Sequence, residues 1–239
     1  MEERTWEGRH PALIGRLAGV AGAASVVLLL APGSLGGPGY GTRMSTPRIA
    51  AWVAQHTGGF PVSGYLGGLG ASVLALFLLL LLSVTRGRGL LASIVVSGAA
   101  ALMAIDWVGT AIVYALADAS GRQQATGGIV ALFSLHNAMT YVDGFAFGLG
   151  VLALSLLQFG SRALPRPLIW LGALTGAYHI VSDPVQLAIS HGPAGATGPV
   201  SLVLVLVWLL AVTIVMLVRP VWNTRPQASA VATEASLIS

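Results

Sequence analysis

Long hydrophobic runs alternate along the chain with short polar segments, and this pattern predicts the secondary structure. Each of six runs has about 20 residues or more and at most one full charge. A helix of about 20 residues crosses roughly 30 Å of hydrocarbon. The pattern therefore predicts six transmembrane helices, over residues 12–31, 62–84, 90–116, 128–159, 168–190 and 200–218.

The expected fold class is all-α, a polytopic transmembrane helical bundle. No segment alternates apolar and polar positions as a lipid-facing barrel strand must, so a barrel is excluded. Residues 1–219 are expected to form one transmembrane domain. The small and polar segment 220–239 is expected to be a disordered cytoplasmic tail.

The longest connection, residues 32–61, is expected to contain a short helix over about 47–56. Ser45 or Thr46 is placed to cap this helix, with Pro47 at its first position. Its apolar residues share one side, which predicts that the helix lies on the outer membrane interface, where it could cover the mouth of the bundle.

The arginines predict the orientation of the bundle. Nine lie at the two chain ends and in the second and fourth connections: Arg4, Arg9, Arg16, Arg86, Arg88, Arg162, Arg166, Arg219 and Arg225. Three lie on the other side: Arg43, Arg48 and Arg122. Because positive charge is retained on the cytoplasmic side, both termini are expected in the cytoplasm.

The composition excludes several classes of protein. Hydrophobic residues make up 55% of the chain and charged residues 8%, and there is no cysteine, so disulfides and thiolate metal sites are impossible. A nucleic-acid partner is not expected, because such proteins gather positive charge on one soluble face, whereas these arginines are spread over the connections. Abundant alanine, glycine and arginine without lysine indicate a bacterial plasma-membrane protein whose partners are membrane lipids.

Glycine is abundant, with 31 residues. Gly144 and Gly148 form a small-x-x-x-small pair in the fourth run. In lipid such pairs let helix backbones approach closely, so a packing role is the expected one.

Ionisable residues lie far from any connection in three of the runs. They are Asp106, His136, His179 and Asp183, with Asp143 as a fifth. An aspartate in the bilayer costs roughly 2.5–3.5 kcal/mol, so such groups must face protein or water. Counted from the outer helix ends, the first four lie roughly 10–17 Å below the outer boundary, and Asp143 lies deeper.

The polar residues of the fourth run form a stripe. His136, Thr140 and Asp143 are spaced i, i+4 and i+7 and therefore share one helical face. At about 32 residues, this run exceeds an ordinary span, so the helix should tilt, kink near its glycines or project outward.

The fifth run carries a second stripe. His179, Asp183 and Gln186 share one face, and Pro184 removes a backbone donor beside them. Together the two stripes and the third run predict a polar ligand pocket in the outer half of the bilayer, formed by Asp106, His136, Thr140, Asp143, His179, Asp183 and Gln186.

Four roles for this polar layer stay open. The groups could satisfy one another as a structural network, form a binding cavity or proton pathway, or perform acid–base catalysis with Asp106 or Asp183 as the acid and His136 or His179 as the base. The two histidines could also ligate a haem iron or, with a carboxylate, a divalent metal. Histidines this close to aspartates more simply share a proton, so no metal and no cofactor is expected.

The stretch "FAFGLGVLALSLLQFGSRALPRPLIWLGALTGAY" resembles the bacterial family of six-span membrane proteins catalogued as domain of unknown function 4386. The similar features are a glycine-rich fourth run, an arginine linker with "LPR" and a glycine early in the fifth run. The upstream layout, with one span, a long outer loop and "GGLGASVLALFLLLL", is similar too. The resemblance implies the six-span topology and brings no established activity.

The sequence thus predicts an integral membrane protein with a buried polar pocket that binds a small or lipidic ligand. Phosphate-binding loops, zinc-peptidase helices and nucleophile elbows are absent from the sequence. One alternative is an intramembrane acid/base enzyme acting on a lipid or isoprenoid, and another is a proton-coupled transporter. Whether the protein is an enzyme is left open by the sequence.

Overall fold

The computed structural model describes residues 11–34, 45–122, 126–161, 163–188 and 197–219. Over these residues the chain is helical and contains no strand, which confirms the all-α fold class. The helices are α2 (Pro11–Ser34), α3 (Thr46–His56), α4 (Phe60–Thr85), α5 (Leu90–Gly121), α6 (Thr126–Ser161), α7 (Arg166–Ala188) and α8 (Thr197–Val218).

Five of the described helices are long and apolar enough to cross a membrane, namely α2, α4, α5, α6 and α8. The helix α7 is not among them, because it carries the polar residues His179, Asp183 and Gln186 within 23 residues. A multi-pass helical bundle is therefore observed, and the count of six spans stays a prediction.

The helices overlap the expected ranges, and most differ from them by a few residues at each end. The largest extension is in α5, which continues to Gly121. Pro184 lies inside α7, and the helix continues past it to Ala188. The expected tail, 220–239, and the loop residues 35–44 lie outside the described residues.

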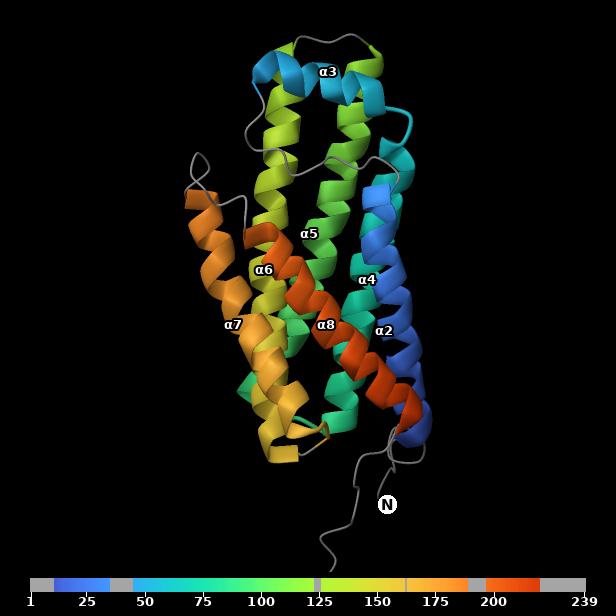
Figure 1. Ribbon diagram of the computed structural model, residues 1–239, viewed down its shortest axis with the longest axis vertical. Coiled ribbons are helices and arrows are strands. Elements are labelled where there is room, and N and C mark those ends of the chain that lie inside the picture. Colours follow the sequence, from blue (N-terminus) through green and yellow to red (C-terminus); the bar gives the residue numbers. More distant parts are fainter. Residues whose placement is uncertain (1–10, 35–44, 123–125, 162, 189–196, 220–239) are drawn as a thin grey trace, which may run out of the picture.

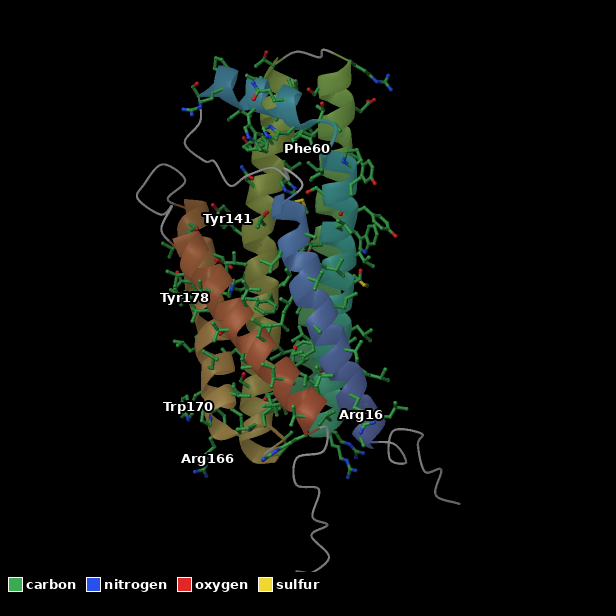
Figure 2. The ribbon with its side chains drawn as sticks, turned by 45° about the vertical axis from the view of Figure 1, so that its right-hand side comes forward. Arg16, Phe60, Tyr141, Arg166, Trp170 and Tyr178 are labelled. Carbon is green, nitrogen blue, oxygen red and sulfur yellow. The ribbon has the colours of Figure 1, made fainter. Side chains whose placement is uncertain are left out.

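Consecutive long helices pack side by side in an up-and-down arrangement (Figure 1). The helix α2 also contacts both α4 and α8. The first residues of α2 and the last residues of α8 lie at the same end of the bundle, and α3 lies at the opposite end. Arg16 and Arg166 both lie at the end away from α3 (Figure 2). We call it the basic end.

Two helices are much longer than the others and project beyond them. At 1.5 Å per residue, α5 with 32 residues and α6 with 36 are about 48 and 54 Å long, whereas α8 with 22 residues is about 33 Å long. Both project past α2, α7 and α8 on the side of α3, which lies across their ends (Figure 1). The long fourth run, which was expected to tilt, kink or project, therefore forms a helix that projects beyond its neighbours, and α5 does the same.

Apolar packing divides the interior into two clusters. The larger one fills the space between the long helices around Phe77, Leu154 and Trp208. The smaller one lies under α3, where Ile49 and Val53 pack against the projecting parts of α5 and α6. The helix α3 therefore covers the end of the α5–α6 pair through buried apolar contacts.

The start of α3 is close to the expected one. Ser45 is its N-cap residue, its carbonyl accepts a hydrogen bond from Ile49 N at 2.9 Å, and Pro47 stands in the first turn. The Ser45 hydroxyl makes no capping hydrogen bond, so the cap acts through the backbone alone.

Glycines set the close approach of α6 to both of its neighbours. A Cβ on Gly98 of α5 would lie 3.0 Å from Ala146 O of α6, and a Cβ on Gly148 would lie 2.8 Å from Gly176 O of α7. Side chains larger than hydrogen would therefore force the helices apart. The packing role expected for Gly148 is confirmed, and this close approach brings polar groups of the three helices within reach of one another.

Candidate functional site

Three aspartates from three helices lie at one level of the bundle. Asp106 follows the start of α5 at Leu90 by about 16 residues, Asp143 precedes the end of α6 by about 18, and Asp183 follows the start of α7 by about 17. All three counts begin at the basic end. They place the carboxyls about 24–27 Å from that end along the helices.

This arrangement corrects the depths expected from the sequence. Asp143 does not lie deeper than the other groups but at the level of Asp106 and Asp183. His136 is seven residues, or about 10 Å, further toward α3. The expectation was wrong because depths were counted from the outer helix ends, and α5 and α6 project beyond α7 at that side.

The Asp106 and Asp143 carboxyls meet across the α5–α6 contact. A side-chain hydrogen bond joins them, and Asp143 also interacts electrostatically with Asp183. A carboxylate has no hydrogen to donate, so the bond between the two carboxyls needs a proton on one of them. The Asp143 oxygen Oδ1 is buried and receives no hydrogen bond from an N–H or hydroxyl group of the described residues.

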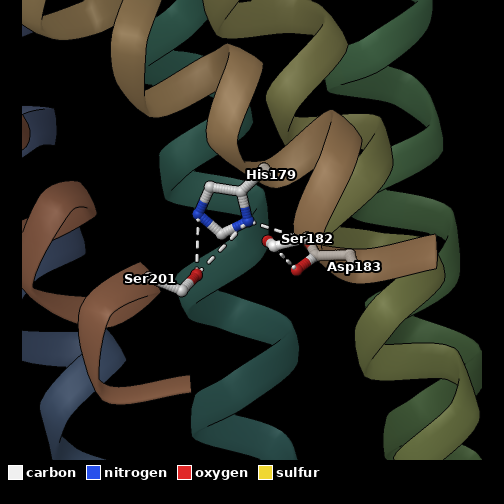
Figure 3. Close-up of polar contacts among 4 residues, drawn as sticks. All are labelled: His179, Ser182, Asp183 and Ser201. Carbon is white, nitrogen blue, oxygen red and sulfur yellow. Dashed lines mark hydrogen bonds and ion pairs between the residues drawn. The ribbon is translucent and has the colours of Figure 1, made fainter. Parts of the chain in front are cut away.

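Asp183 is held by its own helix. His179 Nδ1 lies 2.8 Å from Asp183 Oδ2, four residues away on the same face, and the Ser182 hydroxyl donates to Asp183 Oδ1 at 3.0 Å (Figure 3). Because a carboxylate only accepts, Nδ1 carries the hydrogen of the first bond. His179 and Asp183 are both buried, so this pair is shielded from competing solvent.

Ser201 extends the contacts to α8. Its hydroxyl oxygen lies 2.9 Å from His179 Nε2 and 3.4 Å from Nδ1 (Figure 3). An oxygen in line with the Nε2 lone pair would lie far from Nδ1, on the opposite side of the ring. Ser201 Oγ therefore stands beside the imidazole rather than in line with Nε2, which is not the alignment of a serine nucleophile with its histidine base.

We call Asp106, Asp143, His179, Ser182, Asp183 and Ser201 the acid–imidazole cluster. It joins α5, α6, α7 and α8. Sequence reasoning missed Ser182 and Ser201, because serine is common in apolar helices, where it usually bonds to its own backbone. The one available signal was that Ser201 lies near the start of an otherwise apolar run.

Gly144 makes room for the cluster on α6. A Cβ at this position would overlap Asp183 Oδ2 and would lie 3.1 Å from His179 Nδ1. The ring of Phe147, one turn further along α6, meets the His179 ring edge to face, with 5.4 Å between centroids. The helix α6 therefore supplies both the space for the His179 imidazole and an apolar ring against it.

The other expected site residues lie apart from these contacts. His136 lies against α5, with Nδ1 3.8 Å from the position of a Cβ on Gly109, and the Thr140 hydroxyl donates to the His136 carbonyl of its own helix at 3.2 Å. Gln186 is buried on α7, one turn beyond Asp183. The structure thus brings together Asp106, Asp143, His179 and Asp183, and it does not join His136 or Thr140 to them.

The possibility of a metal site can be tested on the geometry. Among the residues that the structure describes, no three histidine, aspartate or glutamate side chains are arranged so that they could hold a metal ion. The described side chains therefore give a divalent-metal site with three protein ligands no support.

The apolar helices and their arrangement define the class: the protein is an integral membrane protein with several membrane-crossing helices. Comparison of the chain with protein-family models, with curated proteins and with solved structures finds no match.

Proposed function

We propose that the protein binds a small or lipidic ligand at the acid–imidazole cluster, and that the group reaching the cluster is an ammonium-like cation. The observation that carries this proposal is that three carboxyls, from α5, α6 and α7, lie at one level of an apolar bundle, with Asp143 bonded to Asp106 and interacting electrostatically with Asp183. Groups this expensive to bury mark binding sites and ion pathways in membrane proteins.

The charge balance of the cluster favours a cation. Three carboxyls face one imidazole, and the described arginines lie at the two ends of the bundle, away from this level. Even with one proton shared between Asp106 and Asp143, negative charge remains. An ammonium group has three donors and no acceptor, so it complements groups that mainly accept.

A buried carboxyl oxygen without an N–H or hydroxyl donor favours a binding site over a purely structural network. In a self-sufficient network, each buried polar atom has a hydrogen-bond partner. Asp143 Oδ1 is buried and receives no hydrogen bond from an N–H or hydroxyl group of the described residues. A ligand donor at this oxygen would complete the cluster.

The test uses hexylammonium as the probe, with hexanoate and 1-hexanol as the size-matched anion and neutral molecule. In the full-length protein in neutral detergent, only hexylammonium should raise the thermal unfolding temperature, because a ligand that binds the folded state stabilises it. Substitution of Asp143 by asparagine should remove most of this shift.

The controls separate binding at the cluster from effects on the micelle. Asp118→Asn removes an exposed aspartate of α5 that pairs with Arg122, and it should leave the hexylammonium shift unchanged. Equal shifts with all three probes, or a shift that Asp143→Asn leaves intact, would reject the cation site.

A second candidate is an intramembrane acid/base enzyme that acts on a lipid or isoprenoid. The observation that favours it is the contact of His179 with both Asp183 and Ser201. Because Ser201 Oγ is out of line with Nε2, we expect a lipid-soluble fluorophosphonate not to label Ser201. Labelling that disappears in His179→Gln would replace the ligand-binding proposal with this one.

We also propose that the protein is a six-span bacterial plasma-membrane protein of the family catalogued as domain of unknown function 4386. Support for a cytoplasmic basic end comes from the arginines: Arg16, Arg86, Arg88, Arg166 and Arg219 belong to the inner side by the positive-inside rule. The acid–imidazole cluster would then lie near the outer boundary of a roughly 30 Å hydrocarbon layer, reachable from outside.

A further inference from the structure

Three arginines lie at the basic-end termini of three helices, α2 and two that pack against it. Arg16 belongs to α2, Arg86 ends α4, and Arg219 follows α8, and all three are exposed. The helix α2 contacts both α4 and α8. We call these three residues the arginine cluster.

The packing of α2 on α8 brings two of these arginines to the same level. A Cβ on Gly19 would lie 2.7 Å from Leu217 Cδ2 and 3.1 Å from Leu217 N. The two helices run in opposite directions (Figure 1), so Arg16, one turn before Gly19, is level with the end of α8 at Arg219. Two arginines on neighbouring helices therefore lie at the same level of the bundle.

An exposed apolar strip borders the arginine cluster. Leu13 and Leu17 flank Arg16 on α2 and are 46% and 43% exposed, and Val218 beside Arg219 is 71% exposed. The strip continues away from the basic end at Val20, which is 59% exposed. A surface with positive charge at one edge and apolar side chains beyond it matches the headgroup and the acyl chains of a lipid.

The four aspartates among the described residues are Asp106, Asp118, Asp143 and Asp183, and each lies about 24 Å or more along its helix from the basic end. The glutamates Glu2, Glu3 and Glu7 lie outside the described residues. The chain has no lysine. Guanidinium groups bind phosphate oxygens through two parallel hydrogen bonds, which a lysine cannot do.

We propose that the arginine cluster binds the phosphodiester headgroup of an anionic phospholipid, whose acyl chains lie along the apolar strip of α2 and α8. Free phosphate offers the same oxygens but nothing to cover Leu17 and Val20. The lipid covers both parts of the surface, since anionic headgroups attract basic groups at the membrane surface and acyl chains cover apolar side chains.

The experiment uses the absence of cysteine from the chain. Leu17→Cys, in the full-length protein reconstituted into bilayers, is labelled with a bimane fluorophore and quenched by phosphatidylglycerol or phosphatidylcholine with identical brominated acyl chains. The relative association constant should favour phosphatidylglycerol several-fold at this label. Val108→Cys, an exposed position of α5 about 27 Å from the basic end, should show no preference.

The arginines are then removed together. R16Q/R86Q/R219Q should abolish the preference at Leu17→Cys, whereas R48Q, which removes an exposed arginine of α3, should keep it. Equal quenching by both lipids at Leu17→Cys would overturn the proposal, and this outcome does not depend on whether the triple variant folds. A preference that survives R16Q/R86Q/R219Q, that is as strong at Val108→Cys, or that millimolar inorganic phosphate removes would overturn it as well.

Discussion

Gly144 serves both the packing of α7 on α6 and the acid–imidazole cluster. The absence of a side chain at this position lets Asp183 and His179 of α7 lie directly against α6. The spacing of the fourth run indicated a packing glycine, but it could not show that the group packed onto it is an aspartate. That detail depends on the register between α6 and α7, which a single sequence does not contain.

Gly144→Ala should weaken the fold, although alanine favours a helix by up to about 1 kcal/mol over glycine. The new methyl group would overlap Asp183 Oδ2, so the His179–Asp183 pair must shift from its buried position. We expect a lower unfolding temperature and weaker hexylammonium binding. Thermal unfolding followed by circular dichroism, with and without hexylammonium, measures both.

Gly67→Ala is the matched control, because a Cβ at Gly67 in the interior of α4 meets no atom within 4 Å. It should be neutral or slightly stabilising. If the two alanine variants behave alike, the close approach of α7 to Gly144 is contradicted.

Pairs within one helix were predictable, and pairs between helices were not. The i, i+4 spacing of His179 and Asp183 placed them on one face, and the structure joins them at 2.8 Å. The contact between Asp106 and Asp143 depends on the close packing of α5 on α6, where Gly98 lies against the backbone of α6. Hydrophobic periodicity gives helix positions but no register between helices.

At the scale of the helices, the projecting parts of α5 and α6 are the least expected feature. The long fourth run indicated a projection, but α5 was expected to end near residue 116, and it continues to Gly121. The exposed side chains of the projecting part include Ala115 and the ion-paired Asp118 and Arg122, with 2.8 Å between Arg122 Nε and Asp118 Oδ1. This part of the surface suits water better than hydrocarbon.

Single cysteines test this placement without interference from native thiols. Met103 and Ala115 are both exposed on α5, about 20 and 38 Å from the basic end. In right-side-out membrane vesicles, a membrane-impermeant maleimide should label Ala115→Cys and leave Met103→Cys unlabelled, because thiols in hydrocarbon do not ionise.

Labelling after solubilisation in sodium dodecyl sulfate should be complete for both variants, which confirms that both thiols are present. If Met103→Cys and Ala115→Cys label equally in vesicles, α5 does not leave the membrane between these positions. Labelling of Ala115→Cys from the opposite side only would reverse the proposed orientation.

At the scale of the whole molecule, the bundle has two chemically different ends. The basic end carries the start of α2 and the end of α8, and the other end carries α3 over a separate apolar cluster. The arginine pattern of the sequence predicted which segments share an end. It could not predict that α3 packs onto the α5–α6 pair, because its apolar side is equally compatible with the membrane surface.

At a cation site in the acid–imidazole cluster, Asp106 and Asp183 would act on one ligand from two different helices. Groups that share a network or ligand show coupling energies of about 0.5–3 kcal/mol, whereas independent sites are additive. The most direct test is the hexylammonium dissociation constant of Asp106→Asn, Asp183→Asn and the double variant, measured by titration calorimetry.

We predict that each single substitution raises the hexylammonium dissociation constant about tenfold or more. The double variant should raise it by much less than the product of the two single increases. Losses that multiply, or a single variant that binds as tightly as the unaltered protein, would contradict the account.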